Sequence, residues 1–145
     1  MMRQLRDLLF CTFVAMALAA TASAAENGKT IVYNLTTDES WSAGMALGQA
    51  NKALEKGYKV VILLNVRGVF LAAKGFQTDK WAGSHLDLRD MLEEIVKYGG
   101  RVIVCPLCLQ KAGLGPKQLI EGVELGGPEV TLKLITGDDT VVISY

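Results

Sequence analysis

The chain has 145 residues, with 15 basic and 15 acidic side chains, so its formal net charge at neutral pH is zero. A chain of this length is typical of one domain and can bury a hydrophobic core without metal or disulfide support. The balanced charge argues against nucleic-acid binding, and no apolar stretch after the N-terminal one argues for a membrane span.

The N-terminal residues have the features of a secretion signal in the expected order. Two arginines near the start precede an apolar run over residues 8–20, and Ala22-Ser23-Ala24 matches a small-residue cleavage site. The apolar run is shorter than the roughly 20 residues that span a bilayer, so a cleaved signal is favoured over an uncleaved anchor. We therefore expect a signal peptide over residues 1–24, a mature domain over residues 25–145, and a periplasmic or secreted protein.

The first half of the mature chain alternates between strand and helix patterns. Residues 29–35 are rich in β-formers and predict a strand, whereas residues 40–56 place apolar side chains on one helical face. Residues 59–66 are almost continuously apolar, which predicts a strand covered on both faces. Thr36-Thr37-Asp38-Glu39, before the helix, resembles a capping box that would start it.

The second half continues in the same way with shorter elements. Residues 86–98 have one apolar stripe and predict the clearest helix, and residues 101–104 predict a third strand. Residues 129–136 fit one arm of a hairpin, yet Pro128-Glu129 after two glycines also fits a helix start. The other expected elements are a short helical segment at 68–73, a loop at 74–84, a helical turn at 109–112, a short helix at 116–121, and strands at 123–125 and 141–145.

This alternation of strands and helices predicts the fold class. Short connections between the elements favour βαβ crossovers and parallel pairing of strands. The sequence has no internal repeat, low-complexity segment or linker. We therefore expect a single α/β domain with a mainly parallel five-stranded sheet flanked by helices.

One C-x-x-C motif, Cys105 to Cys108, concentrates the chemistry of the mature chain. It follows the third predicted strand, and in parallel sheets functional groups gather at the carboxyl ends of strands. Pro106 is a favoured first helical residue, so we expect Cys105 to be a helix N-cap, where backbone amides stabilise a thiolate over a thiol. Cys108, one turn later, is placed to form a disulfide or to resolve a modification on Cys105. An inert pair, either buried or bridged, is the alternative.

At these residues the sequence resembles the DsrE/DsrF-like (YchN-like) sulfur-relay family. The strand-Cys-x-x-Cys arrangement and the glycine after it, residues 102–113 (VIVCPLCLQKAG), carry the resemblance, which extends over most of the mature chain. It implies that Cys105 carries sulfur as a persulfide and that the domain assembles into trimers or hexamers. It also favours the short-helix interpretation of residues 128–136.

The sequence therefore predicts a periplasmic sulfur-handling protein, a sulfurtransferase or a sulfur carrier, with Cys105 as the carrier and Cys108 as the resolving or releasing thiol. Its expected partners are sulfur donor and acceptor proteins or small sulfur compounds, together with further copies of the chain. Two alternatives stay open: a thiol–disulfide redox module, and a non-catalytic oligomeric binding module with a structural C-x-x-C disulfide. No cofactor is expected, because no phosphate-cradling glycine loop is present.

Four other residues have possible roles near the cysteines. Arg67 ends the second predicted strand at the same sheet edge as Cys105, either as a solvated residue or as a cation that favours an anion. Trp41 and Trp81 either wall a pocket over Cys105 or pack in the core or at a subunit interface. His85, the only histidine, either assists a thiol, joins the cysteines on a metal, or occupies a helix-start or surface position. No metal is expected, because closed sites use four ligands.

Overall fold

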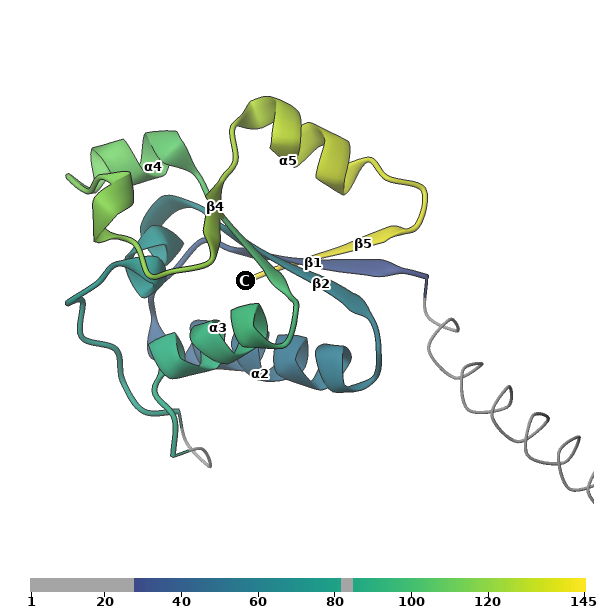
Figure 1. Ribbon diagram of the computed structural model, residues 1–145, viewed down its shortest axis with the longest axis horizontal. Helices are drawn as coiled ribbons and strands as arrows, with labels where there is room; N and C mark the ends of the chain where they lie inside the picture. Colours follow the sequence, from purple (N-terminus) through teal and green to yellow (C-terminus); the bar gives the residue numbers. More distant parts are fainter. Residues whose placement is uncertain (1–27, 82–84) are drawn as a thin grey trace, which may run out of the picture.

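The computed structural model describes residues 28–81 and 85–145, so the expected signal peptide lies outside the described residues. Within these residues five strands form one sheet in the order β4-β3-β2-β1-β5, and every neighbouring pair is parallel. Figure 1 views this sheet nearly edge-on, with α2 and α3 on one side and α5 on the other. The predicted α/β fold with a five-stranded sheet is confirmed, and the pairing is entirely parallel.

The elements follow the order expected from the sequence, and residues 128–135 form a helix, as the family resemblance favours. The second strand ends two residues before the predicted position, because the chain turns there into a 3₁₀ helix. The strands are β1 (Thr30–Leu35), β2 (Lys59–Leu64), β3 (Arg101–Val104), β4 (Val123–Leu125) and β5 (Thr140–Ser144). The helices are α2 (Ser40–Glu55), α3 (Leu88–Lys97), α4 (Pro106–Lys111) and α5 (Pro128–Ile135), with 3₁₀ helices η2 (Val66–Ala72) and η3 (Pro116–Gln118).

The core is divided by the sheet into a large and a small part. The large part lies between the sheet and helices α2 and α3, and includes the apolar side chains of both helices. The small part consists of Val32, Val61, Leu63 and Ile103 on the opposite face, with Leu134 of α5 packed against them. Strand β2 contributes to both parts, which explains why its sequence is continuously apolar.

The parallel register brings the carboxyl ends of the strands together. Leu35 of β1 pairs with Leu64 of β2, and Leu64 pairs with Val104 of β3. The backbone amide of Cys105 extends this ladder by donating to the carbonyl of Leu64 across 3.0 Å. The segments that follow β1, β2 and β3 therefore meet on the side of the sheet where these strands end, and η2 and α4 begin there.

The start of helix α2 differs from the predicted capping box. The N-cap is Glu39, whose carboxylate accepts hydrogen bonds from the amides of Trp41 and Ser42 at 2.8 and 2.9 Å. The hydroxyl of Thr37 instead accepts from the amide of Glu39, so the threonine stabilises the turn before the helix. The backbone hydrogen bonds to Ser42 and Trp41 lower the pKa of Glu39.

None of the helices in the described ranges combines the length and apolar character that a membrane crossing requires.

Candidate functional site

Cys105 follows β3 directly and is the N-cap of helix α4, as predicted. Its backbone is extended, with φ −66° and ψ 115°, and Pro106 takes the first helical position. The Cys105 sulfur accepts a hydrogen bond from the backbone amide of Cys108 at 3.3 Å. The sulfur is therefore held at the start of α4 as the acceptor of a backbone amide.

Cys108 lies one turn further along α4 and is half-buried. Burial raises the pKa of the Cys108 thiol, and the hydrogen bond with the Cys105 side chain raises it further. A backbone hydrogen bond at Val66 acts in the opposite direction. Both cysteines are free thiols. Cys108 therefore tends to keep its proton and to act as a hydrogen-bond partner of the Cys105 sulfur.

Val66, at the start of η2, brings an unusual backbone conformation to the cysteine pair. Its φ is +48°, in the left-handed region that β-branched residues rarely adopt. The turn is held by hydrogen bonds from Arg67 to the Thr36 carbonyl at 3.1 Å and from Gly68 to the Asn65 carbonyl at 2.8 Å. Backbone strain of this kind clusters at functional sites. Here the strained residue is the one whose backbone forms a hydrogen bond with the Cys108 thiol.

A cavity of about 430 Å³ opens between η2 and α4, beside Cys108. Its lining is mostly apolar, with two cationic side chains and no carboxylate: Val66, Arg67, Phe70, Leu107, Cys108, Lys111 and Ala112. The sequence indicated a cation near the site, but it gave no reason to place Phe70 or Leu107 there. Leu107 is 68% exposed in the structure, and its apolar side chain alone did not distinguish it from a core residue.

Arg67 is fixed in the cavity wall by two partners. Its guanidinium forms two hydrogen bonds with the Asp38 carboxylate, at 2.8 and 2.6 Å. It also lies over the ring of Phe70, 5.2 Å from the ring centroid. The predicted cation is therefore at the predicted edge, where its side chain is 63% exposed and its charge is paired with Asp38.

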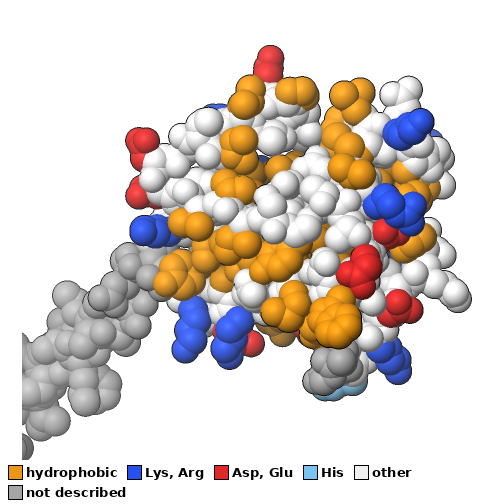
Figure 2. All heavy atoms as spheres, turned by 180° about the vertical axis from the view of Figure 1, so that it is seen from behind, with side chains coloured by type: hydrophobic (Ala, Val, Ile, Leu, Met, Phe, Trp, Pro, Cys, Tyr) orange, Lys and Arg blue, Asp and Glu red, His pale blue; other side chains and the backbone are white. Residues whose placement is uncertain are grey.

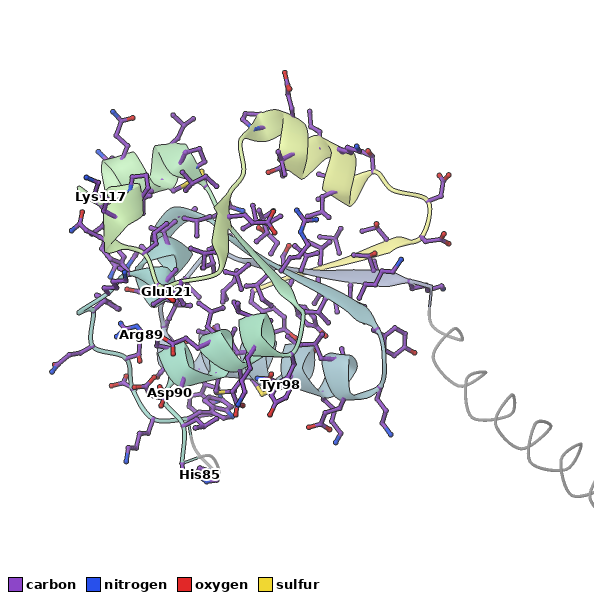
Figure 3. The ribbon with its side chains drawn as sticks, in the orientation of Figure 1. His85, Arg89, Asp90, Tyr98, Lys117 and Glu121 are labelled. Atoms are coloured by element: carbon purple, nitrogen blue, oxygen red, sulfur yellow. The ribbon has the colours of Figure 1, made fainter. Side chains whose placement is uncertain are left out.

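The tryptophans and the histidine lie apart from this cavity. Trp81 packs against the core, which confirms its predicted packing role, whereas Trp41 is 75% exposed on α2. Neither tryptophan lines the cavity beside Cys108. His85 is exposed before α3, and Figure 3 shows it far from α4, so it does not assist the thiols. Within the described residues, His, Cys, Asp and Glu form no group of three that would hold a metal ion.

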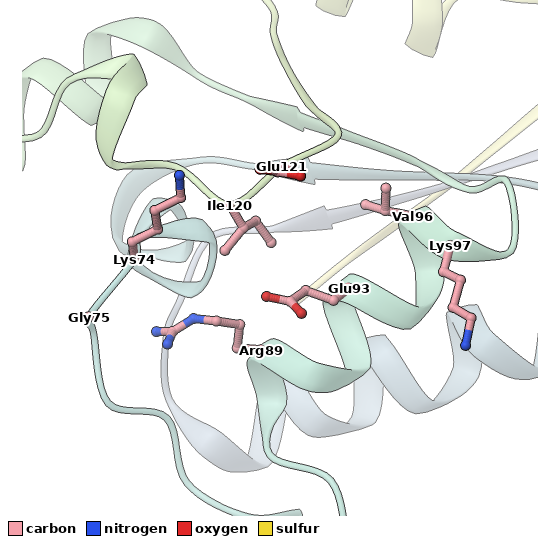
Figure 4. Close-up of a pocket in the computed structure, with 8 residues that line it drawn as sticks. All are labelled: Lys74, Gly75, Arg89, Glu93, Val96, Lys97, Ile120 and Glu121. Carbon is pink, nitrogen blue, oxygen red and sulfur yellow. The ribbon is translucent and has the colours of Figure 1, made fainter.

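A second cavity, of about 530 Å³, lies between the segment after η2, helix α3 and the loop before β4 (Figure 4). Three cations and two carboxylates line it: Lys74, Arg89, Lys97, Glu93 and Glu121. Arg89 donates to the carbonyl of Phe76, and its buried Nε has no hydrogen-bond partner. No cysteine lines this cavity, so it is separate from the thiol site.

Comparison with known proteins shows which family and fold the chain shares. A model of the DsrE/DsrF-like family matches residues 16–143. An uncharacterized protein of Methanopyrus kandleri, MK0008, is 35% identical over 97 residues, which is 67% of this chain and 77% of the relative.

Two solved structures have a similar fold. The YchN protein of E. coli aligns with a TM-score of 0.64 at 23% identity, over 81% of this chain and all of YchN. MTH1491 of Methanobacterium thermoautotrophicum, a protein of unknown function, aligns with a TM-score of 0.63 at 14% identity, over 81% of this chain and 99% of that protein. At these identities the two structures establish the shared fold.

Proposed function

Because the chain belongs to the DsrE/DsrF-like family, we propose that it is a sulfur-relay protein in which Cys105 carries sulfane sulfur as a persulfide. The observation that supports this role is the Cys105 sulfur at the end of β3, which accepts the amide hydrogen of Cys108 at 3.3 Å. This position, at a strand end and beside a backbone donor, is one from which a cysteine can act as a nucleophile. Cys108, which tends to keep its proton, is the resolving or releasing thiol.

Loading requires no reagent other than the donor. The Cys105 thiolate attacks the outer sulfur of a persulfide R–S–SH, a new sulfur–sulfur bond forms, and the S–S bond of the donor breaks. The electron pair leaves with R–S⁻, and Cys105 becomes Cys105–S–SH. An acceptor thiolate removes the outer sulfur by the same exchange, which returns the Cys105 thiolate.

Cys108 provides a second way to release the sulfur. Cys108 attacks the inner sulfur of the Cys105 persulfide anion and forms the Cys105–Cys108 disulfide. The S–S bond of the persulfide breaks, the Cys108 proton passes to the outer sulfur, and hydrosulfide leaves. The outer sulfur is reduced and the two cysteines are oxidised, so a dithiol reductant must then restore the pair. The hydrogen bond between the two cysteine side chains supports this short-range exchange.

Intact-mass measurement tests the carrier role. The reduced protein is incubated with inorganic polysulfide, freed of donor and weighed; a mass gain of one sulfur atom, lost on treatment with dithiothreitol, is expected. The Cys108→Ser protein should keep the added sulfur longer than the wild type. If Cys105→Ser gains sulfur to the same extent as the wild type, Cys105 is not the carrier.

The contact between the two thiols also favours a second candidate, a thiol–disulfide redox module. Such a module cycles between dithiol and disulfide at a potential close to that of its compartment. Titration against glutathione redox buffers distinguishes it: a reversible transition together with no persulfide loading favours the redox module. A bridge that resists reduction across this range favours the structural disulfide of a binding module.

We also propose that the protein is exported and that copies of it associate into trimers or hexamers. Large apolar side chains are exposed on the edge strand β5 and on α5: Val141, Val142, Val130, Leu132 and Ile135. Figure 2 looks onto the β5 edge of the molecule, where apolar side chains form a band across the face. An edge strand also leaves backbone groups unpaired, so a partner surface gains both contacts and hydrogen bonds.

Two measurements check these proposals. N-terminal sequencing of the protein from the periplasm should begin at Ala25, and an intact Met1 there contradicts cleavage.

Light scattering should give the mass of three or six chains for the wild type and a lower mass for Val142→Lys. A wild-type mass equal to one chain contradicts the assembly.

A further inference from the structure

We infer that the cavity beside Cys108 selects the sulfur donor, and that this donor is a small organic sulfane-sulfur anion with an apolar carbon substituent. The inference rests on the proposed function, since it names the class of compound that loads Cys105. It is carried by the lining of the cavity between η2 and α4.

The walls of the cavity are suited to an apolar group. Four of its seven lining residues, Val66, Phe70, Leu107 and Ala112, are apolar. Leu107 and Val66 are 68% and 60% exposed, so large apolar side chains meet water at a reactive site. An apolar substituent that covers them removes this surface from water, which an inorganic donor cannot do to the same extent.

The charges of the cavity are suited to an anion. Two cations line it, and no carboxylate does. Asp38 neutralises Arg67 through two hydrogen bonds, whereas Lys111 takes part in none of the ion pairs found in the described ranges. Lys111 therefore leaves one positive charge for the sulfur-bearing end of a donor, next to Cys108.

The position of the cavity links this selection to the chemistry. Cys108 is part of the wall, and its amide is bonded to the Cys105 sulfur at 3.3 Å. A donor whose apolar part rests on Leu107 and Phe70 thus holds its sulfur end close to the cysteine pair. A thiosulfonate, R–SO₂–S⁻, has the required parts: an apolar R, an anionic end and a sulfane sulfur.

Transfer from a thiosulfonate is balanced without a further reagent. The Cys105 thiolate attacks the sulfane sulfur, a bond forms between the two sulfur atoms, and the S–SO₂ bond breaks. The electron pair leaves with the sulfinate R–SO₂⁻, and Cys105 carries a persulfide anion. One thiolate and one thiosulfonate thus give one persulfide and one sulfinate of the same total charge.

The test compares two donors that have the same reacting group and charge. Reduced full-length protein is treated with benzenethiosulfonate or methanethiosulfonate, and the rate of persulfide formation on Cys105 is followed by peptide mass spectrometry. Each rate is divided by the rate of the same donor with glutathione, which removes differences in intrinsic reactivity. We expect the phenyl donor to be favoured about tenfold, because of the additional apolar area it buries.

Three variants locate the preference. Leu107→Ser should reduce the phenyl-to-methyl ratio to about one third or less, since it removes an apolar wall. Lys111→Gln should slow both donors alike and leave the ratio unchanged. Tyr98→Ser is the matched control, because Tyr98 is 63% exposed but lies at the end of α3, away from α4 (Figure 3), and it should change neither rate.

A ratio close to one, or a ratio that Leu107→Ser leaves unchanged, overturns the inference and leaves the proposed function standing. Loading of Cys105 by inorganic polysulfide but by neither thiosulfonate has the same meaning. Failure of all three donors to load Cys105 overturns the proposed function, and the inference with it.

Discussion

Trp81 and Gly44 lie in direct contact: a β-carbon added to Gly44 of helix α2 would stand 2.0 Å from the indole ring of Trp81. The ring comes from the segment before α3, so the contact joins that segment to α2. Only a residue without a side chain leaves room for the ring at this point of the helix.

We expect Gly44→Ala to lower the free energy of unfolding by about 1–3 kcal/mol, because the added methyl group overpacks the site. Gly48, one turn further along α2, is the matched control. A β-carbon added there would have the Met91 methyl carbon as its nearest neighbour, at 3.9 Å. Gly48→Ala should raise the free energy of unfolding by roughly 0.5–1 kcal/mol, because alanine favours a helix more than glycine does.

Urea unfolding of the two variants gives these values. In a Trp41→Phe background, Trp81 is the remaining tryptophan, and Gly44→Ala should shift its emission to longer wavelength as the ring moves into water. Equal stability of the two alanine variants would show that the ring does not occupy this position.

Alanine variants in a helix are usually more stable than glycine variants, and at Val66 we expect the opposite order of stability. The φ of +48° is strained for any residue with a β-carbon, by about 1–2 kcal/mol, whereas glycine adopts it freely. The free energy of unfolding of Val66→Gly should therefore exceed that of Val66→Ala by about 1 kcal/mol. The same pair at Leu107, which lies in α4, should show alanine as the more stable variant. Alanine more stable than glycine at both positions would contradict a left-handed Val66.

Alkylation of Cys108 should report the cause of its shifted ionisation. Burial and the Cys105 side chain raise its pKa above 9.0, so its reaction with iodoacetamide should reach half of the maximum rate above pH 9.0. In Cys105→Ala the hydrogen bond and charge of Cys105 are absent and only burial raises the pKa, so the midpoint should move to lower pH. Peptide mass spectrometry at a series of pH values gives both midpoints, and an unchanged midpoint in the variant would exclude thiol–thiol coupling.

Asp87, the N-cap of α3, should contribute stability that depends on pH. Burial acts to raise its pKa, but hydrogen bonds from Asp90, Thr78 and Arg89 outweigh it and hold the pKa below the ordinary 3.8. A carboxyl group with a lowered folded-state pKa stabilises the fold above its unfolded-state pKa, and this contribution is lost as pH falls through the folded-state value.

We expect Asp87→Ala to cost about 1 kcal/mol at neutral pH, because the amides of Arg89 and Asp90 lose their acceptor. Asp87→Asn keeps an acceptor that does not titrate. The advantage of the wild type over Asp87→Asn, measured by urea unfolding, should shrink as pH falls below 3.8. An advantage that is constant down to acidic pH would contradict the lowered pKa.

The sequence by itself determined the features that neighbouring residues encode. Alternating apolar patterns predicted the parallel α/β fold, because hydrophobic periodicity and short connections restrict how a chain can bury its apolar faces. Cys105 as the N-cap of α4 followed from its position between an apolar strand and Pro106. The cap of α2 was misassigned because several adjacent residues have suitable oxygens, and only the backbone geometry selects Glu39.

Only the tertiary structure decided the features that depend on distant residues meeting. The pairing of Arg67 with Asp38 and the apolar wall of Phe70 and Leu107 arise because β1, β2 and β3 align their carboxyl ends. The segment at 128–135 has an apolar pattern that suits a strand or a helix; it is a helix because β5 already pairs with β1 and Leu134 covers the second face of the sheet. Contacts of this kind have no local signal, since their free energy is gained only when the register of the whole sheet is set.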